Sequence, residues 1–195
     1  MCFMKDIFKK IYLNNEWLSA YGTYSGPGSS IECSEIFIDF LQDFIIKNNI
    51  KSILDVGCGD FNLLKHLNFQ NIHYKGIDVV DFLIDDLNIK YKSSNICFEY
   101  KDLTKEKENG SYDLVIIKDV LQHLSYKSIF SLLENVNGKN LFIINDFFEN
   151  YNVDMNDGGW RYVNMAIDPF NLKGKHIFEW PVLSVTKKVF HIINE

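Results

Sequence analysis

Two glycines, separated by one residue, follow a short apolar run and lie beside acidic residues. The run over residues 53–56 leads into Gly57-Cys58-Gly59, with Asp55 before the glycines and Asp60 after them. Glycine lets the backbone turn sharply and approach a ligand without a Cβ in the way, and the start of a following helix supplies free N–H groups. The segment therefore predicts a ligand-binding loop at the end of a strand.

A dinucleotide-binding loop is the nearest alternative for this pattern. Its GxGxxG spacing asks for a third small residue, so that helix and strand pack closely around a pyrophosphate. Asn62 occupies that third place and is too large for the role. The spacing thus disfavours NAD or FAD as the ligand.

An acid follows the next predicted strand. Asp78 comes 21 residues after Gly57, and this spacing suits a carboxylate that accepts hydrogen bonds from both hydroxyl groups of a ribose. Alternatively, Asp78 faces solvent and caps the next helix. Residues 100–104 and 117–124 also follow predicted strands. All four segments belong at the carboxyl edge of a parallel sheet, where open α/β folds bind their ligands.

His123, in the last of these segments, is the candidate general base. Its unperturbed pKa of about 6.5 suits proton transfer at neutral pH. Alternatively, it belongs to a first helical turn and contacts only backbone or water. Asp119 is a second candidate, either as the base or as the group that orients His123, and Asp146 is a weaker third.

The segment over residues 154–161 follows the last predicted parallel strand and is a candidate acceptor site. The Arg161 guanidinium can bind a phosphate or carboxylate with two hydrogen bonds, and Trp160 offers a flat face for a sugar ring. The competing interpretation is that Trp160 packs on the core while Arg161 pairs with a nearby Asp.

The elements that position these residues alternate between strand and helix. A capping box at residues 29–32 precedes apolar residues at helical spacing, which predicts a helix over residues 30–48. Strands are predicted at 53–56, 73–78, 96–100, 112–117 and 140–145, with continuous apolar runs at 114–117 and 141–144, and closing strands at 182–185 and 189–193. Helical segments are expected from the glycine loop through Leu67, at 82–91, and from Ile129 to Val136, with His123 at a helix start. The pattern predicts an α/β protein, a three-layer α/β/α sandwich around a doubly wound, mostly parallel seven-stranded sheet.

Composition limits the class of protein. A chain of 195 residues fits one domain, and a formal net charge of −6 argues against binding long nucleic acids. Cysteines at positions 2, 33, 58 and 97 lack metal-ligand spacing, so we expect no metal site and reduced thiols in a cytoplasm. No export signal or membrane span is visible. Phe3, Ile7, Phe8 and Ile11 predict an amphipathic helix on the domain's own core, with a membrane-surface helix as the alternative.

Five motifs carry a resemblance to a known family. They are SGPGS at residues 25–29, the CGDFN loop within 55–62, DVLxHLS at 119–125, GGWR at 158–161 with Asn164, and DPFNL at 168–172. The chain resembles class I S-adenosylmethionine (SAM)-dependent methyltransferases with a Rossmann-like fold, within them a bacterial family associated with capsular polysaccharide modification. The resemblance covers about residues 25–181. It departs at Asp168, where a first Pro is usual, and at Gln122.

The resemblance implies a cofactor site, residue by residue. SAM, which becomes S-adenosylhomocysteine (SAH), would contact a loop formed by Asp55, Gly57, Cys58 and Gly59. Its ribose would contact Asp78 and Val79, its adenine Asp102 and Leu103, and its methionine portion Lys118, Asp119 and Val120. Tyr24 and Ser29 would belong to an amino-terminal helical lid, residues 1–30, of a single domain over residues 1–195. The catalytic candidates are His123, Asp119 and Arg161.

The expected reaction is methyl transfer to an oxygen of a small polar acceptor. A sugar hydroxyl or a phosphoryl or phosphoramidate-type oxygen in capsular polysaccharide biosynthesis is the class that the resemblance implies. The alternative is a non-catalytic partner or regulatory subunit of another methyltransferase. A homo-oligomer or a complex with a partner methyltransferase would both be compatible with the small size of the chain.

Overall fold

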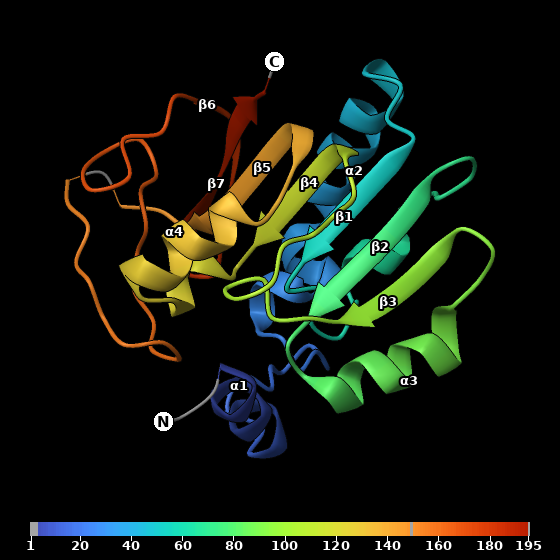
Figure 1. Ribbon diagram of the computed structural model, residues 1–195, viewed down its shortest axis with the longest axis horizontal. Coiled ribbons are helices and arrows are strands. Elements are labelled where there is room, and N and C mark those ends of the chain that lie inside the picture. The colour runs from blue at the N-terminus through green and yellow to red at the C-terminus, as the bar shows by residue number, and fades with distance from the viewer. Residues whose placement is uncertain (1–3, 149, 195) are drawn as a thin grey trace.

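The predicted apolar strands form one seven-stranded sheet in the order β3-β2-β1-β4-β5-β7-β6 (Figure 1). This arrangement is that of a computed structural model, which describes residues 4–148 and 150–194. β1 to β5 pair in parallel, and β7 lies antiparallel between β5 and β6. The predicted fold class is thereby confirmed. The strands are β1 (Ser52–Val56), β2 (His73–Asp78), β3 (Ile96–Tyr100), β4 (Tyr112–Lys118), β5 (Gly138–Asp146), β6 (Lys175–Val182) and β7 (Val185–Ile193).

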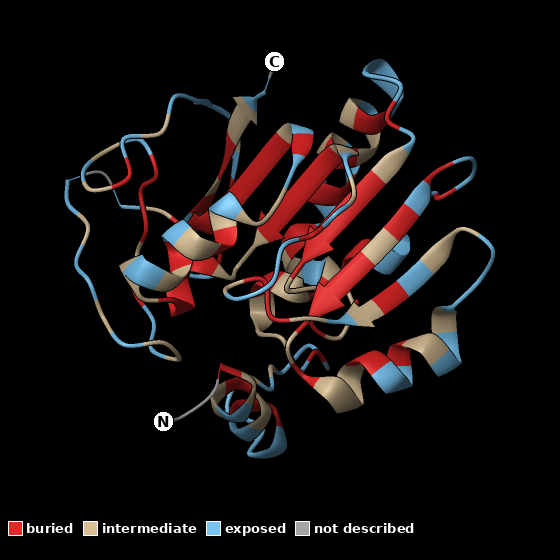
Figure 2. Ribbon diagram, viewed as in Figure 1, coloured by how far each residue is buried: buried red, intermediate tan, exposed pale blue. Residues whose placement is uncertain are grey.

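Alternate strand residues pack on opposite faces of the sheet, and this produces the three layers. Ile53 and Ile116 contribute to a core with α2 and α3, whereas their neighbours Leu54 and Ile117 contribute to a core with α1 and α4. The central strands are buried along most of their length (Figure 2). Burial on both faces explains why they are continuous apolar runs. The helices are α1 (Met4–Leu13), α2 (Ile31–Lys47), α3 (Asp81–Tyr91) and α4 (Tyr126–Glu134).

Hydroxyl side chains cap two of the helices. Ser30 Oγ accepts a hydrogen bond from Cys33 N at 3.3 Å and begins α2. Ser125 Oγ accepts one from Ser128 N at 3.3 Å and begins α4. Each bond satisfies an amide that has no partner inside the helix. The predicted helices at 30–48 and 82–91 are confirmed with small differences at their ends.

Three local predictions were wrong. The expected helix after the glycine loop is only a 3₁₀ turn, Leu64–His66, because Phe61 takes a left-handed conformation at φ 56° before it. The expected strand at 182–185 is a hairpin, in which Leu183 at φ 54° makes the turn between β6 and β7. His123 does not start a helix; it ends a 3₁₀ turn, Leu121–His123, two residues before the Ser125 cap.

The amino-terminal helix α1 packs on the domain's own core, as predicted. Phe8 and Ile11 are buried with Met4 and Tyr12, whereas Phe3 lies outside the described residues. The ammonium groups of Lys5 and Lys9 contact Asp81 at the start of α3. No helix within residues 4–148 and 150–194 has the length and apolar character needed to cross a membrane.

Candidate functional site

A cleft with about 800 Å³ of empty space, part of it open to solvent, lies at the carboxyl ends of β1, β2 and β4. Figure 1 shows α1 beyond the arrowheads of these strands. Met4, Phe8 and Tyr12 of α1, together with Trp17, line the cleft on this side. The sheet edge and the amino-terminal segment thus form opposite walls.

The predicted glycine loop forms the floor of the cleft. Gly57 has φ 72°, and a Cβ there would lie 2.3 Å from Val120 Cγ2. Gly59 has φ 53°, and a Cβ there would lie 2.4 Å from Ser25 Oγ. Gly57 N donates to Ile77 O at 2.7 Å, which ties the loop to β2. Only glycine fits these positions without strain, and both glycines line the cleft.

Asp78 links the glycine loop to the start of α3. Its Oδ2 accepts a hydrogen bond from Gly59 N at 3.0 Å, and its Oδ1 accepts one from Val80 N at 3.0 Å. The carboxylate lines the cleft although it is buried, and burial raises its pKa. Each carboxylate oxygen can accept a further bond, so Asp78 can still receive hydroxyl donors from a ligand.

Asp55 lies beneath the loop and outside the main cleft. Tyr74 Oη donates to Asp55 Oδ2 at 2.6 Å, and both side chains are buried. Burial raises the pKa of Asp55 to about 7. The carboxyl instead lines a smaller adjoining cavity together with Cys58 and Lys118, which also line the main cleft.

The other end of the cleft combines one carboxylate with apolar side chains. Asp102 is buried, and Oδ1 accepts a hydrogen bond from Thr104 Oγ1 at 2.6 Å. Leu103 is buried beside it, and Asn135 Nδ2 donates to Leu103 O at 3.0 Å. Val79 lies between this group and Asp78 along the wall. The arrangement suits a flat, mainly apolar group that carries one amine.

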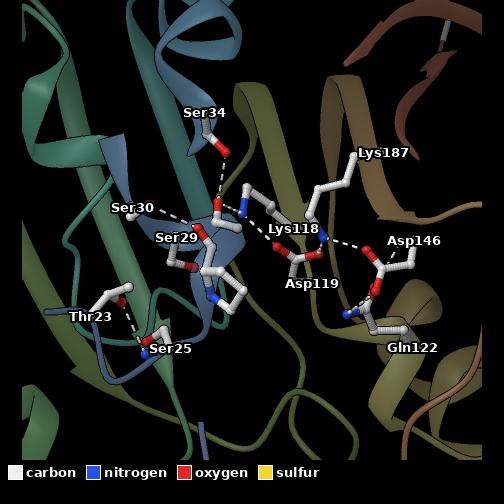
Figure 3. A network of polar contacts seen from close by, with 12 residues as sticks. Thr23, Ser25, Ser29, Ser30, Ser34, Lys118, Asp119, Gln122, Asp146 and Lys187 are labelled. Atoms are coloured by element: carbon white, nitrogen blue, oxygen red, sulfur yellow. Dashed lines mark hydrogen bonds and ion pairs between the residues drawn. The ribbon is translucent and has the colours of Figure 1, made fainter. Parts of the chain in front are cut away.

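A buried charge network closes the side of the cleft next to β5 and β7 (Figure 3). Lys118 and Lys187 both contact the carboxylate of Asp119, and Lys187 also donates to Asp146 Oδ1 at 2.6 Å. Gln122 Oε1 accepts a hydrogen bond from Asp146 N at 2.8 Å. Although burial acts to raise it, the pKa of Asp119 is held far below its usual range by the charges of Lys118 and Lys187.

The SGPGS segment packs against this network. Lys118 Nζ donates to Gly28 O at 2.8 Å, and Ser34 Oγ donates to the same oxygen at 2.9 Å. A Cβ on Gly28 would lie 2.6 Å from Lys187 Cε. Ser29 lines the cleft, and its carbonyl accepts a hydrogen bond from Asn62 Nδ2 at 3.2 Å.

His123 lines the cleft and is held by the GGWR segment. Its Nδ1 lies 2.7 Å from Gly159 O, and Gly158 N donates to His123 O at 2.8 Å. Since a carbonyl only accepts, Nδ1 carries the proton and Nε2 is the nitrogen that can receive one. Burial lowers the pKa of His123, which keeps the ring neutral at neutral pH. The Trp17 ring lies over it, with centroids 4.6 Å apart.

Two predicted site residues do not reach the cleft. Tyr24 is exposed, and its backbone N donates to Asp60 Oδ2 at 2.8 Å. The Arg161 guanidinium lies 5.2 Å from the ring centroid of Tyr126 and is buried, and its nitrogens have no hydrogen-bond partner among the described residues. Trp160 is half exposed, and Nε1 donates to Asp146 Oδ2 at 2.9 Å.

Trp17 and Lys187 are site residues that sequence reasoning missed. A signal existed for Lys187, because a lysine stands two positions before Val189 in an apolar closing strand, on the face that should be buried. Trp17 lies in an irregular segment, and no periodicity pointed to it. No group of metal-binding side chains occurs in the part of the chain that the structure describes.

Comparison with known proteins agrees with this geometry. Residues 54–139 match the family model described as a methyltransferase domain. Ubiquinone biosynthesis O-methyltransferase of Paraburkholderia xenovorans is 28% identical over 78 residues, 38% of this chain and 34% of that protein. Phosphoethanolamine N-methyltransferase of Plasmodium falciparum is 32% identical over 91 residues, 45% of this chain and 34% of that protein. The chain thus spans about a third of the length of these curated relatives.

Solved structures share the whole fold. Magnesium protoporphyrin IX methyltransferase of Synechocystis with bound SAM superposes with a TM-score of 0.66 at 15% identity, covering 100% of this chain and 99% of that chain. The N-terminal domain of EvdMO1, in the presence of SAH and D-fucose, gives 0.59 at 12% identity, covering 81% and 82%. At sequence identities of 15% and 12%, the similarity to these structures shows a shared fold and nothing more.

The strand order is that of the Rossmann-like fold of SAM-dependent methyltransferases, and residues 54–139 match a methyltransferase domain. The cofactor of this class is SAM, as the sequence predicted.

The chemistry of the cleft fits SAM. Gly57 and Gly59 line the cleft, and Asp78 and Asp102 supply acceptors for hydroxyl and amine donors. Ionised Asp119 also lines the cleft, where it pairs with Lys118 and Lys187.

Proposed function

We propose that this chain binds SAM in the cleft and transfers its methyl group to an oxygen atom of a small polar acceptor. When bound, SAM supplies a methyl group already activated by a sulfonium centre. The protein then has to align the acceptor, exclude water and remove a proton where the acceptor is a hydroxyl. The observation that carries the proposal is a neutral histidine, His123, held at the same cleft as the glycine loop and Asp78.

The proposed cofactor contacts follow the walls of the cleft. The loop at Gly57, Cys58 and Gly59, supported from below by Asp55, carries the cofactor. Asp78 and Val79 bind the ribose. The residues proposed at the two ends of the cleft are Asp102 and Leu103 for the adenine, and Lys118, Asp119 and Val120 for the methionine portion. Ser29 covers the cofactor, and Tyr24 belongs to the same covering segment of a lid formed by residues 1–30.

His123 is proposed as the general base. The Gly159 carbonyl holds the Nδ1 proton, so that Nε2 takes the proton of an acceptor hydroxyl while its oxygen gains the methyl group. Asp119 stays ionised between two lysines, which supports a positioning role for it rather than proton transfer. Arg161 is proposed to order the GGWR segment, since its guanidinium lies 5.2 Å from the ring centroid of Tyr126.

The acceptor class rests on the motifs that the chain shares with capsule-associated methyltransferases. They favour a sugar hydroxyl or a phosphoryl-type oxygen in capsular polysaccharide biosynthesis. The curated relatives include both O- and N-methyltransferases by name. A neutral base beside the cleft favours an oxygen acceptor that has to lose a proton.

Isothermal titration calorimetry with SAM and SAH tests the proposal. We expect saturable binding of both by the unmodified protein, and at least tenfold weaker binding by Asp78→Ala, because the ribose loses charged acceptors. Asp78→Asn controls for the two loop hydrogen bonds, and Asp85→Ala, an exposed position on α3, is the matched control. If the unmodified protein binds neither compound, the proposal is wrong. Binding without methyl transfer to any acceptor supports the non-catalytic partner instead.

A further inference from the structure

We propose that the acceptor is a neutral ring compound that presents a hydroxyl to His123 and lies against Trp17, which selects it. This inference rests on the proposed function and deepens it, since it chooses a neutral hydroxyl over a phosphoryl oxygen. Three observations carry it: the position of Trp17, the pairing of the cleft's cations and the orientation of the His123 ring.

Trp17 forms an aromatic wall directly beside His123, the proposed general base. Its ring centroid lies 4.6 Å from that of His123, and the planes are inclined by 36°. Phe8 and Tyr12 hold the indole from α1, with centroids 5.8 Å and 5.7 Å away. Trp17 is only half buried and lines the cleft. A large, flat and supported surface beside a proton acceptor suits the face of a ring.

The cations around the cleft are already bound to carboxylates. Lys187 contacts both Asp119 and Asp146, and Lys118 contacts Asp119. Lys101 at the other end donates to Glu108 Oε2 at 2.9 Å. Binding of a phosphate next to His123 would place its negative charges near two ionised carboxylates and would compete with them for lysines. A neutral acceptor carries no such cost.

Arg161 does not change this balance. Its guanidinium lies over the Tyr126 ring outside the cleft, and the acidic groups that act on it are Asp154 and Asp157. A phosphoryl group at His123 therefore gains no pairing with Arg161 in this arrangement.

The orientation of His123 also favours a hydroxyl. A phosphoryl oxygen is already anionic and needs no base, whereas a hydroxyl must lose its proton to Nε2. The Gly159 carbonyl fixes the tautomer that leaves Nε2 as the acceptor. A hydroxyl acceptor thus needs Nε2 of His123 as a proton acceptor, whereas a phosphoryl acceptor does not.

The experiment compares two neutral probes with their phosphate esters on the SAH-loaded protein. Phenol and methyl glucoside are titrated against phenyl phosphate and methyl glucoside 6-phosphate, and the imidazole signals of His123 are followed by NMR. The His123→Gln spectrum assigns them. We expect at least one neutral probe to shift these signals saturably and to bind at least tenfold more tightly than its own phosphate ester. Whether phenol or methyl glucoside responds identifies an aromatic or a sugar ring.

Variants of Trp17 test its part in the selection. Trp17→Ala should weaken binding of the responding probe at least tenfold, whereas Trp17→Phe, which retains a flat ring, should keep the affinity within about threefold. Leu18→Ala, at the adjacent exposed position, should leave the affinity unchanged. Tighter binding of a phosphate ester, or equal binding by Trp17→Ala, overturns the inference. So does the absence of any probe-induced shift in a protein that binds SAH, which leaves the proposed function intact. Loss of SAH binding itself would instead contradict the proposed function. The comparison of probes on the unmodified protein stands even if Trp17→Ala does not fold.

Discussion

Lys187 Nζ contacts the carboxylate of Asp119 across the end of the sheet, 68 positions apart in the chain. The same ammonium donates to Asp146 Oδ1 at 2.6 Å, and its stem lies against Gly28. One side chain from an antiparallel closing strand therefore joins the ends of β4 and β5 to the amino-terminal loop. Lys187 and Asp146 are buried and the Asp119 side chain is only 14% exposed, so the ammonium compensates charges that water reaches poorly.

Lys187→Met tests this contact. Removing the ammonium leaves Asp119 and Asp146 buried with less compensation, so the free energy of unfolding should fall by about 3–5 kcal/mol at pH 7. The loss should shrink at pH 5. Lys187 no longer lowers the pKa of Asp119 in the variant, and the carboxyl can then be neutralised by a proton. Urea unfolding at both pH values measures the effect.

The control for this variant is Lys139→Met on the neighbouring strand β5. Lys139 Nζ lies 3.1 Å from Asp113 Oδ1, but its side chain is 74% exposed. Exposed pairs contribute about 1 kcal/mol or less. Equal losses of unfolding free energy in the two variants would show that the buried ion pairs of Lys187 stabilise the fold no more than an exposed pair does.

His123→Ala should lower kcat at least tenfold for a hydroxyl acceptor. Burial holds the pKa of His123 below its ordinary value, so the rate of the unmodified enzyme should rise with pH through a pKa below about 6.5. That acid limb should disappear in His123→Gln. Steady-state rates as a function of pH check both points, with His73→Gln at an exposed position as the control. A pH profile that survives the substitution would argue against a base role.

The fold was predictable because its signals are local. The predicted strands at 112–117 and 140–145, with their continuous apolar runs, fall within β4 and β5, since a strand buried on both faces has to be apolar along most of its length. The turn at Leu183 was missed because a leucine in the left-handed region is set by the hairpin around it, and no local propensity for that conformation exists.

The site was predictable only where one short motif supplies several of its groups. The glycine loop and Asp78 fall within 21 residues of one another, and their spacing indicated the cleft. Trp17 meets His123 only through the packing of α1, and this contact is invisible in either segment alone. Arg161 belongs to the motif that holds His123, but its guanidinium lies over the Tyr126 ring.

Gly57→Ala should weaken SAH binding at least tenfold and destabilise the fold. Its Cβ would lie 2.3 Å from Val120 Cγ2 in the wall of the cleft, in addition to the strain at φ 72°. Gly22→Ala is a matched control, because Gly22 has φ 76° and open space where the Cβ would be. It should cost only the backbone strain, about 1 kcal/mol. Calorimetry and thermal unfolding measure the two effects.

Val120→Ala offers a rescue of this substitution. If the clash is responsible, removal of Cγ2 should restore part of the stability lost in Gly57→Ala. The double variant should then lose less unfolding free energy than the two single variants lose together. Additive losses would assign the defect to backbone strain alone.

Asp55→Asn should remove a pH dependence that the buried carboxyl imposes on folding. Burial raises the pKa of Asp55 to about 7, whereas an unfolded aspartate has a pKa of about 3.9. Between these values the folded protein holds a proton that the unfolded chain has released, so rising pH favours unfolding. The contribution of Asp55 to stability is complete below the unfolded pKa and is lost as the pH rises through the folded pKa.

The difference in unfolding free energy between the unmodified protein and Asp55→Asn isolates this contribution. Asparagine can still accept the hydrogen bond from Tyr74 Oη and does not titrate. The advantage of the unmodified protein should therefore fall by about 1 kcal/mol per pH unit from pH 5 and level off above pH 7. Urea unfolding at pH 5, 6, 7 and 8 gives the slope. A difference that stays constant, or that grows with pH, would mean that Asp55 is already ionised in the folded protein and that the charge of nearby Lys118 outweighs burial.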